Sequence, residues 1–280
     1  MSCLFLSDLY SDQINGGAEN NDAVLIQHLR DKGVELECRS TKDITPDEIS
    51  AFNCIILSNF ILLSEQAKAH LTNNCRYVIY EHDHKYINTR DPSKFVDFKA
   101  PPAQLINADL YANAAQVVVL SKICKSVVEK NLGINNVHSI GTSLWSTKKF
   151  KFIKQLIKGA TKTKDLAVLN SPNPTKGTIP AVEFCKTNGM SPDLINSPDQ
   201  YEFLQILSEY RTLLFIPQVL ETFCRLVAEA KMLNCNIQTK KNLIGLMSEP
   251  YSDQSGLELL ETLEKKVEEA LDHFYELVTE

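Results

Sequence analysis

Short apolar runs alternate with amphipathic segments along the first half of the chain. The runs have the length of buried strands, and the segments between them repeat their apolar positions at the spacing of a helix. Such alternation predicts βαβ units built around a parallel sheet. We expect strands at Cys3–Leu6, Val34–Cys38, Cys54–Leu57, Arg76–Tyr80, Gln116–Leu120 and Asn136–Ile140, and helices at Ala18–Asp31, Ser64–Thr72, Pro101–Ala114 and Ser121–Asn131.

The alternation stops after Trp145, where a lysine-rich stretch follows, and it resumes at Leu166. We therefore predict three parts: residues 1–147, residues 148–256 and a terminal amphipathic helix over residues 257–280. In the second part we expect strands at Leu166–Asn170, Leu213–Ile216 and Cys235–Gln238, helices from Gly177, from Asp199 and over Phe223–Leu233, and a long loop through Pro192 and Pro198.

Two glutamates, Glu221 and Glu229, follow the predicted strand Leu213–Ile216 at a separation of eight positions. Open α/β sheets bind ligands outside the carboxyl ends of their strands, where a helix N-terminus offers N–H groups to a phosphate. Carboxylates at the same place accept hydrogen bonds from sugar and ribose hydroxyls. The pattern indicates a sugar-nucleotide site. The alternative is that Glu221 caps the helix and Glu229 lies on its solvated face.

Two further loops follow predicted strands. Gly16 and Gly17 precede a predicted helix in Gly16-Gly-Ala-Glu19, and paired glycines permit close approach of a ligand, although they also serve plain turns. Lys176 stands immediately before Gly177, after a strand and a proline-rich loop. Its ammonium group at that position can neutralise a diphosphate.

These three stretches, in this order and spacing, resemble the glycosyltransferase family 4 type of the GT-B fold. The resemblance covers most of the chain, which is unusually short for the family. It implies an α/β fold with two Rossmann-like domains facing across a cleft, and a C-terminal helix that packs back over their junction. The family motif Glu-(Ser/Thr)-Phe-Gly-x4-Glu-Ala corresponds to Glu221-Thr-Phe-Cys-Arg-Leu-Val-Ala-Glu229-Ala.

The resemblance also implies an activity: retaining transfer of a sugar from a UDP- or GDP-type nucleotide sugar to an acceptor hydroxyl. Glu221 is expected to hold hydroxyls of the donor sugar, Glu229 the ribose diol, and Lys176 the diphosphate. No Asp-x-Asp occurs, so we expect no metal and no cofactor beyond the nucleotide sugar. The residues expected to line the donor site are Gly16, Gly17, Ser171, Lys176, Phe223, Cys224, Arg225 and Glu229.

The chain departs from the family pattern at two places. Cys224 stands where the family has glycine, and Asn170 and Ser171 stand where relatives have a Gly-Arg pair. These departures keep open a second interpretation, in which the chain is a catalytically degenerate nucleotide-sugar-binding or assembly partner. A Rossmann dehydrogenase is excluded, because no Gly-x-Gly-x-x-Gly follows any predicted strand.

Four ionisable residues, Glu81, His82, Asp83 and His84, follow the predicted strand Arg76–Tyr80. We expect His82 to be catalytic, as the residue that contacts the transferred sugar or steers the acceptor hydroxyl, with Glu81 or Asp83 tuning it. Two alternatives remain. The His-x-His spacing of His82 and His84 suits a metal, and an ordinary hydrogen-bonded histidine fits the same pattern.

The net charge of −6 argues against nucleic-acid binding by the surface as a whole. Seven lysines nevertheless crowd Lys148–Lys164, and their spacing predicts a helix with a basic face that is either solvated or in contact with an anionic surface. For the transfer reaction that the resemblance implies, the expected acceptor is a glycan, a lipid-linked sugar or a modified base in DNA. Without a Cys-x-x-Cys motif, a secretory signal or a transmembrane run, we expect a cytoplasmic protein.

Overall fold

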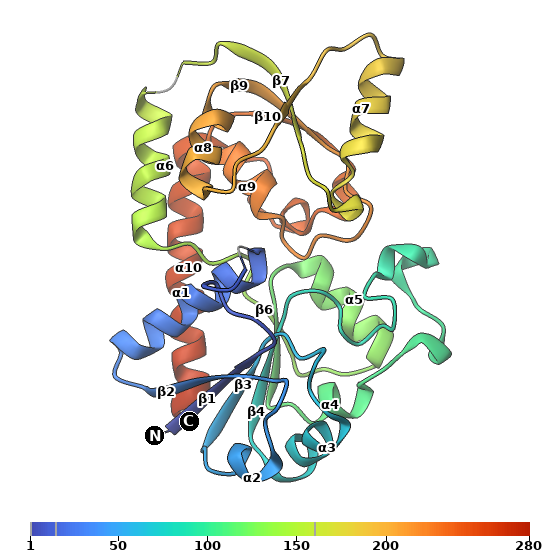
Figure 1. Cartoon of the computed structure of the whole chain (residues 1–280), viewed down its shortest axis with the longest axis vertical. Helices are drawn as coiled ribbons and strands as arrows, with labels where there is room; N and C mark the ends of the chain where they lie inside the picture. Colours follow the sequence, from blue (N-terminus) through green and yellow to red (C-terminus); the bar gives the residue numbers. More distant parts are fainter. Residues whose placement is uncertain (1, 15, 160) are drawn as a thin grey trace. The chain divides into compact units, whose positions relative to one another are not determined.

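The computed structural model of the chain describes residues 2–14, 16–159 and 161–280, which form two compact units. Unit 1 comprises Met1–Leu144 and Lys266–Glu280, and unit 2 comprises Trp145–Lys265 (Figure 1). Each unit contains one parallel β-sheet with helices packed against it. The predicted α/β class with two parallel sheets is confirmed.

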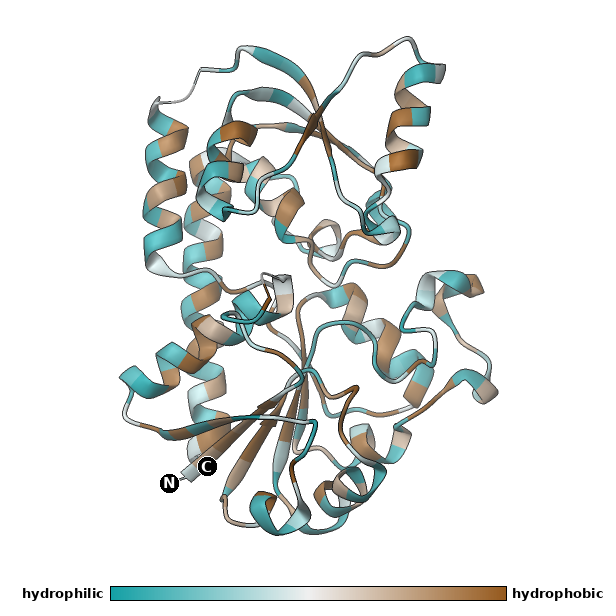
Figure 2. Cartoon of the chain, in the orientation of Figure 1, coloured by the Kyte–Doolittle hydropathy of each residue, from teal (hydrophilic) through white to brown (hydrophobic). Residues whose placement is uncertain are grey.

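The sheet of unit 1 has six parallel strands in the order β2-β1-β3-β4-β5-β6. All six correspond to strands predicted from the apolar runs, and Figure 2 shows the central ones in the brown of hydrophobic residues. The strands are β1 (Ser2–Ser7), β2 (Glu35–Ser40), β3 (Cys54–Leu57), β4 (Tyr77–Glu81), β5 (Gln116–Val119) and β6 (Val137–Ser139). The helices are α1 (Gly17–Asp31), α2 (Pro46–Ile49), α3 (Glu65–Asn74), α4 (Ala108–Ala112) and α5 (Lys122–Leu132).

The helix predicted at Pro101–Ala114 is wrong. The segment contains a short 3₁₀ turn, Pro102–Gln104, and the five-residue helix α4, separated by Asn107 in a left-handed conformation with φ of +56°. Leu105 pairs with Ile87 in an isolated antiparallel bridge, and the Asn107 side chain donates to the carbonyl of Lys85 at 2.8 Å. These tertiary contacts hold the backbone extended where the apolar spacing alone favours a helix.

The sheet of unit 2 has four parallel strands in the order β10-β9-β7-β8. Its core includes Leu166, Val168 and Leu214, packed against Ala181 and Cys185 of a covering helix. The strands are β7 (Lys164–Leu169), β8 (Asp193–Ile195), β9 (Tyr210–Phe215) and β10 (Asn236–Thr239). The helices are α6 (Thr147–Gly159), α7 (Thr178–Thr187), α8 (Gln200–Ser208) and α9 (Arg225–Met232).

The strand β8 lies within the segment predicted to be a long loop. It is three residues long, it pairs only with β7 at the edge of the sheet, and Asp193 and Leu194 are exposed. A strand so short carries no alternating pattern that a sequence can display.

None of the helices in the described ranges is long and apolar enough to cross a membrane.

The last helix, α10 (Gly256–Thr279), confirms the predicted terminal amphipathic helix. Its residues up to Lys265 belong to unit 2 and those from Lys266 to unit 1. In unit 1 the ring of Phe274 meets Tyr80 of β4 edge-on, with centroids 4.8 Å apart, and Arg76 donates to the carbonyl of Leu277 at 2.6 Å. The apolar stripe read from the sequence is therefore used for packing within the chain.

A stacked pair of histidines joins α10 to the sheet of unit 1 and predicts a pH dependence. The rings of His138 on β6 and His273 on α10 lie 4.1 Å apart. Burial, followed by the charges of His273 and Lys125, lowers the pKa of His138 to about 4, and burial also lowers the pKa of His273. The unfolded chain, with histidine pKa values near ~6.5, then binds more protons than the folded one. The neutral histidine pair therefore contributes to the free energy of unfolding in full above about pH 6.5, and this contribution is lost as the pH falls toward 4.

We expect the melting temperature of the wild type to fall between pH 7.5 and pH 5, and that of His138→Gln to fall less. Thermal unfolding followed by circular dichroism measures both. His70→Gln is the control, because His70 on α3 contacts Ser50 and Asn74 and neither stacked ring. An identical loss of melting temperature in the wild type and in His138→Gln would contradict the assignment.

Candidate functional site

The parallel strands of each sheet bring their following loops to one edge, and the predicted site residues lie in these loops or in the helices that follow them. In unit 2, Lys176 and Glu221 form an ion pair, with Lys176 Nζ 2.8 Å from Glu221 Oε1. The lysine side chain is 36% exposed and the glutamate 13%, so the ammonium remains accessible to a ligand. Burial acts to lower the pKa of Lys176, but the neighbouring carboxylate of Glu221 outweighs it and raises that pKa. The ammonium group therefore stays charged at neutral pH.

Backbone contacts fix both members of this pair. The N–H of Gln218 donates to the carbonyl of Thr175 at 2.8 Å, which ties the loop after β9 to the loop that carries Lys176. The N–H of Glu221 donates to the carbonyl of Leu243, and its carbonyl accepts from Gly245, both at 2.9 Å. A pair held in this way needs little reorganisation when a ligand arrives.

The residue that departs from the family motif, Cys224, occupies the N-cap of α9 in a left-handed conformation, with φ of +76°. A side chain costs about 1 kcal/mol there relative to glycine, which gives a physical reason for the glycine of the motif. The thiol is buried, and burial raises its pKa well above the usual range, so the sulfur is not a thiolate at neutral pH. Its neighbour Phe223 is completely buried and lies edge-on to Trp145, at 6.1 Å between ring centroids.

The second glutamate of the motif is buried and has three partners. The indole Nε1 of Trp145 donates to Glu229 Oε1 at 2.8 Å, Lys149 Nζ lies 3.3 Å from the same oxygen, and Arg225 Nη2 lies 3.8 Å from it. Burial acts to raise the pKa of Glu229, but the charges of Lys149 and Arg225 outweigh it and lower that pKa. Glu229 is therefore an ionised acceptor, and it does not lie on a solvated helix face.

Sequence reasoning missed Trp145 and Lys149. The available signal was the position of Lys149 on the apolar side of α6, with Phe150 and Ile153, where a lysine is out of place unless it is paired. Its partner was not readable from the spacing, because Glu229 lies 80 positions further along the chain.

Ser171 is the remaining predicted donor-site residue of unit 2. Its hydroxyl accepts from the N–H of Asn173 at 3.2 Å, and its own N–H donates to Thr178 Oγ1 at 3.0 Å. These bonds give Ser171 a role in shaping the loop that leads to Lys176. Its hydroxyl supplies no positive charge in place of the arginine found in the family pattern.

In unit 1, His82 contacts a carboxylate from α1. His82 Nε2 lies 3.1 Å from Asp22 Oδ1, and both side chains are buried. The hydroxyl of Ser58, after β3, donates to both oxygens of Asp22, at 2.9 and 2.7 Å. The three residues come from the carboxyl ends of two strands and from the helix α1, which begins at Gly17. Asp22 therefore orients the imidazole of His82.

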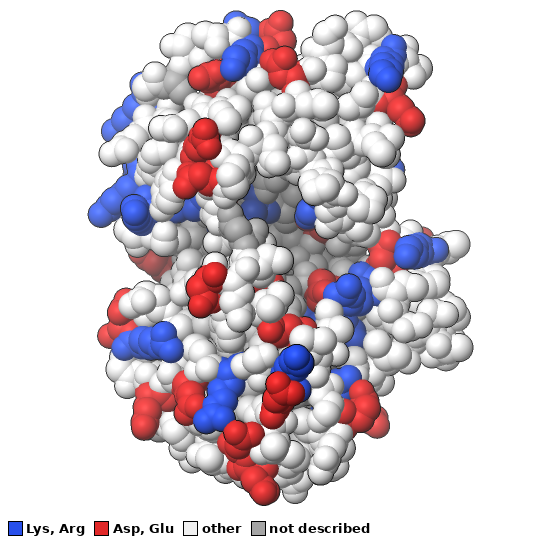
Figure 3. Space-filling view, viewed as in Figure 1, with Lys and Arg blue, Asp and Glu red and all other residues white. Residues whose placement is uncertain are grey.

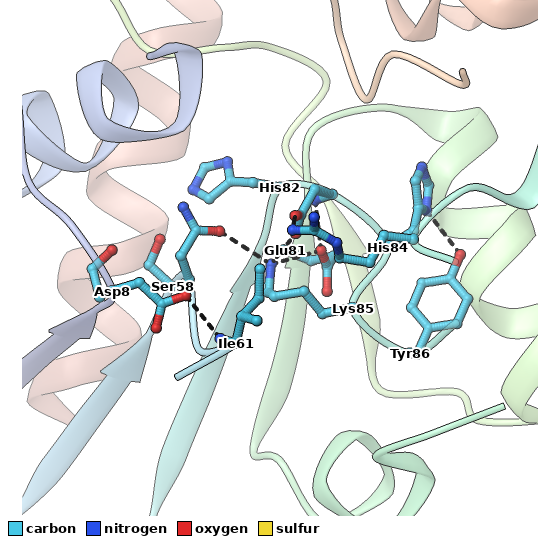
Figure 4. Close-up of polar contacts among 12 residues, drawn as sticks. Asp8, Ser58, Ile61, Glu81, His82, His84, Lys85 and Tyr86 are labelled. Atoms are coloured by element: carbon cyan, nitrogen blue, oxygen red, sulfur yellow. Dashed lines mark hydrogen bonds and ion pairs between the residues drawn. The ribbon is translucent and has the colours of Figure 1, made fainter. Parts of the chain in front are cut away.

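The other ionisable residues beside His82 form a separate cluster, shown in Figure 4. Lys85 Nζ is buried, 2.9 Å from Glu81 Oε1 and 2.7 Å from Asp83 Oδ1. Arg90 Nη1 lies 2.9 Å from the second oxygen of Asp83, and the Tyr111 hydroxyl donates to Glu81. Burial favours the neutral form of Glu81, but Lys85 outweighs it and lowers its pKa. Glu81 and Asp83 are thus paired with the cations Lys85 and Arg90.

His82 and His84 point to different partners. The Nδ1 atom of His84 lies 2.9 Å from the hydroxyl of Tyr86, and burial lowers the pKa of His84, which keeps the ring neutral. Within the described parts of the chain, no group of three or more His, Cys, Asp or Glu is arranged to hold a metal ion. The geometry favours a hydrogen-bonded role for His82 over a His-x-His metal site.

The glycine pair lies at the start of α1, where Gly16 is the N-cap and Gly17 the first helical residue. The carboxyl group of Glu19 folds over Gly16, in the space that a side chain at that position would occupy. Asn59 donates to Glu19 Oε1 at 3.4 Å. Burial raises the pKa of Glu19, which favours its neutral form. The start of α1 therefore carries a carboxyl group directly over its backbone.

Two parallel α/β units of six and four strands, followed by a C-terminal helix, are the architecture of the GT-B glycosyltransferases, and the chain has the GT-B fold. No protein-family model matches the sequence, and no curated protein matches it either. The likeness of the chain to known proteins is therefore one of structure.

Three solved structures illustrate the likeness. HepE of Anabaena, in complex with UDP and glucose, shares 12% sequence identity at a TM-score of 0.56 and covers 97% of this chain and 99% of its own. The catalytic domain of starch synthase IV from Arabidopsis thaliana, bound to ADP and acarbose, shares 9% sequence identity at a TM-score of 0.54. The match covers 99% of this chain and 98% of that domain. AviGT4, a glycosyltransferase involved in avilamycin A biosynthesis, shares 13% sequence identity at a TM-score of 0.51. The match covers 100% of this chain and 94% of AviGT4.

Proposed function

We propose that the chain is a retaining glycosyltransferase that moves a sugar from a nucleotide-diphosphate sugar to an acceptor hydroxyl. The observation that carries the proposal is the Lys176–Glu221 ion pair at the carboxyl ends of β7 and β9, on the GT-B fold. HepE and the starch synthase IV domain, which share the fold, were solved with UDP and with ADP respectively, which supports a nucleoside diphosphate as leaving group.

In this proposal Lys176 neutralises the diphosphate as the bond from the anomeric carbon to the phosphate oxygen breaks. The first N–H groups of α9 and the guanidinium of Arg225 add positive potential at the same loop. The acceptor oxygen attacks the same face of the anomeric carbon, and its proton passes to the departing phosphate. Glu221 holds hydroxyls of the donor sugar, and no metal is needed because protein cations stabilise the charge that develops.

On the acceptor side, we propose that His82, oriented by Asp22, steers the acceptor hydroxyl. His82→Gln should lower kcat by at least about 100-fold, the low end of general acid-base contributions, while donor binding stays unchanged. Steady-state kinetics combined with calorimetric donor binding would separate the two effects. An unchanged kcat would leave His82 with a structural role.

The test of the function is a thermal-shift screen against UDP, GDP, ADP and their sugars, with and without Mg²⁺. A ligand at 100 times its Kd adds about 2.7 kcal/mol to the stability of the state that binds it. We expect one nucleotide to raise the melting temperature without a metal, and Glu221→Gln to weaken binding of the intact donor while sparing the free nucleotide. Equal losses for both ligands would contradict the role given to Glu221.

The same screen separates the enzyme from a degenerate binding partner. The second function is kept because Cys224 replaces the glycine of the motif and no arginine lies beside Asn170. A donor that binds without being transferred to any acceptor would favour the binding partner. A screen in which no nucleotide or nucleotide sugar shifts the melting temperature would reject both.

The exposed face of α6 favours an anionic surface as a further partner, and we propose peripheral contact with anionic lipid there. Lys148, Lys151 and Lys158 are exposed, and none has an acidic partner in the described ranges. Figure 3 shows basic side chains at the left edge of the view, where Figure 1 places α6. A pocket of about 540 Å³ beside them is lined by Thr147, Lys148, Lys151, Phe152, Gln155 and Tyr201.

Three lysines near an anionic bilayer contribute about 3 kcal/mol to the free energy of membrane binding, and salt screens this attraction. We therefore expect weak binding to phosphatidylserine vesicles at low salt, no binding to phosphatidylcholine vesicles, and loss of binding when all three lysines become glutamine. Vesicle sedimentation measures this. Binding to duplex DNA and not to vesicles would point to a nucleic-acid acceptor, and binding to neither would show a solvated face.

A further inference from the structure

We infer that Trp145 and Lys149 are positioning residues that hold Glu229 in place for the ribose of a nucleotide; this inference rests on the proposed function. Both lie in the segment that begins unit 2, just before and within α6, far in sequence from the motif that contains Glu229. Neither belongs to the motif by which the site was recognised in the sequence.

The hydrogen bond of Glu229 and its closest ion-pair contacts end on one carboxylate oxygen. Trp145 Nε1, Lys149 Nζ and Arg225 Nη2 lie 2.8, 3.3 and 3.8 Å from Oε1. The residue is 7% exposed. An ionised carboxylate accepts hydrogen bonds and donates none, so Oε2 suits a hydroxyl donor and repels a phosphate. The two neighbouring hydroxyls of a ribose provide such donors.

The two partners are themselves fixed. Arg225 lies over the indole of Trp145, at 4.7 Å from the ring, and Phe150 and Phe223 pack around it. The ammonium of Lys149 donates to the side-chain carbonyl of Gln200, at the start of α8. Helices α6 and α9 therefore meet at the carboxylate of Glu229, and α8 holds the ammonium of Lys149. A buried charge with fixed partners keeps its orientation when the ligand binds, whereas a solvated glutamate would first lose side-chain entropy.

The consequence is selectivity for ribose. In the wild type, we expect a nucleoside diphosphate to bind at least about tenfold more tightly than its 2′-deoxy form, because a lost hydrogen bond to a charged group is worth about 1.5 to 3 kcal/mol. Without the indole N–H or the ammonium, Oε1 loses a partner and the carboxylate is free to rotate. The affinity for the ribonucleotide then falls, while the affinity for the deoxynucleotide changes little.

The experiment measures Kd by calorimetry for the nucleotide selected from UDP, GDP and ADP, and for its 2′-deoxy form. The variants are Trp145→Phe, which keeps an aromatic ring, and Lys149→Met, which keeps the aliphatic stem. We expect the ratio of the two Kd values to fall by at least threefold in each variant and to recover partly in Lys149→Arg. Lys186→Met is the matched control, because Lys186 is an exposed lysine of the same unit, in the last turn of α7, with no acidic partner in the described ranges.

A measurement on the unaltered protein keeps the inference testable if a variant does not fold. Trp145 is the only tryptophan in the chain, so intrinsic fluorescence reports on the Glu229 contact directly. Saturation with the ribonucleotide should change the emission, and saturation with the 2′-deoxy form should change it less.

The outcomes separate the two claims. Unchanged Kd ratios in both variants, or identical emission changes for the two nucleotides, would overturn the inference and leave the glycosyltransferase standing. If the wild type binds none of the three nucleotides, the proposed function fails and the positioning role fails with it.

Discussion

Replacement of Lys176 by methionine is expected to lower kcat/KM for sugar transfer by about 100-fold or more. The ammonium group lies 2.8 Å from Glu221, at the loops that follow β7 and β9. Loss of one preorganised charge that stabilises a developing negative charge lowers kcat by about 10² to 10³. The substitution also leaves Glu221 without its partner, and a carboxylate facing a diphosphate repels it.

Steady-state kinetics with the donor selected by the screen measures the effect, and the melting temperature shows that the variant is folded. Lys186→Met is the matched control, because Lys186 lies exposed in the last turn of α7 in the same unit. Equal activities of Lys176→Met and Lys186→Met would remove Lys176 from the mechanism. Lys176→Arg keeps the charge and is expected to retain more activity than the methionine variant.

The second large effect is expected from Gly177→Ala. Gly177 adopts φ of +69°, and a Cβ atom there would overlap the backbone carbonyl of Ile216 at the end of β9. Backbone atoms cannot rotate away as a flexible side chain does, so the loops after β7 and β9 would have to separate. We expect a loss of more than about 3 kcal/mol in the free energy of unfolding of unit 2, at the upper end of single substitutions.

Gly189→Ala provides the control for this prediction. Gly189 has nearly the same conformation, with φ of +65°, but no described atom lies within 4 Å of the place that its Cβ would take. Its substitution tests the left-handed conformation alone, and we expect a loss of about 1 kcal/mol. Chemical denaturation of both variants measures the difference, and equal losses would show that the contact with Ile216 is relieved without cost.

Because Lys176 is the residue before Gly177, displacement of this loop also moves the ammonium away from Glu221. Gly177→Ala should therefore lose transfer activity even under conditions in which it remains folded, whereas Gly189→Ala should keep it. The glycine after the lysine thus connects the packing of two strands to the charge that the site depends on.

Local sequence patterns predicted most of the fold. The central strands of unit 1, β1, β3, β4 and β5, are buried along nearly their whole length, so each appears as a continuous apolar run that needs no knowledge of its neighbours. The helix predicted at Pro101–Ala114 failed because Asn107 and the bridge between Ile87 and Leu105 override the local preference. The strand β8 was missed because three residues at a sheet edge carry no periodic signal.

Spacing and residue type predicted which strand ends carry the candidate site residues. Lys176, Glu221, Glu229 and His82 each follow or lie near the end of an apolar run, and the geometry of parallel sheets places such residues at one edge. The strand that each of these residues follows could therefore be predicted from the sequence alone.

Which side chains meet depends on tertiary packing. Lys176 and Glu221 are 45 positions apart, His82 and Asp22 are 60 apart, and Trp145 and Glu229 are 84 apart. Strand order and helix packing set these contacts, and neither is encoded in any local window of sequence. Local spacing thus predicts elements and their ends, whereas the partners of a buried charge depend on the packing of the whole unit, because burial is tolerated only where that packing supplies a counter-charge.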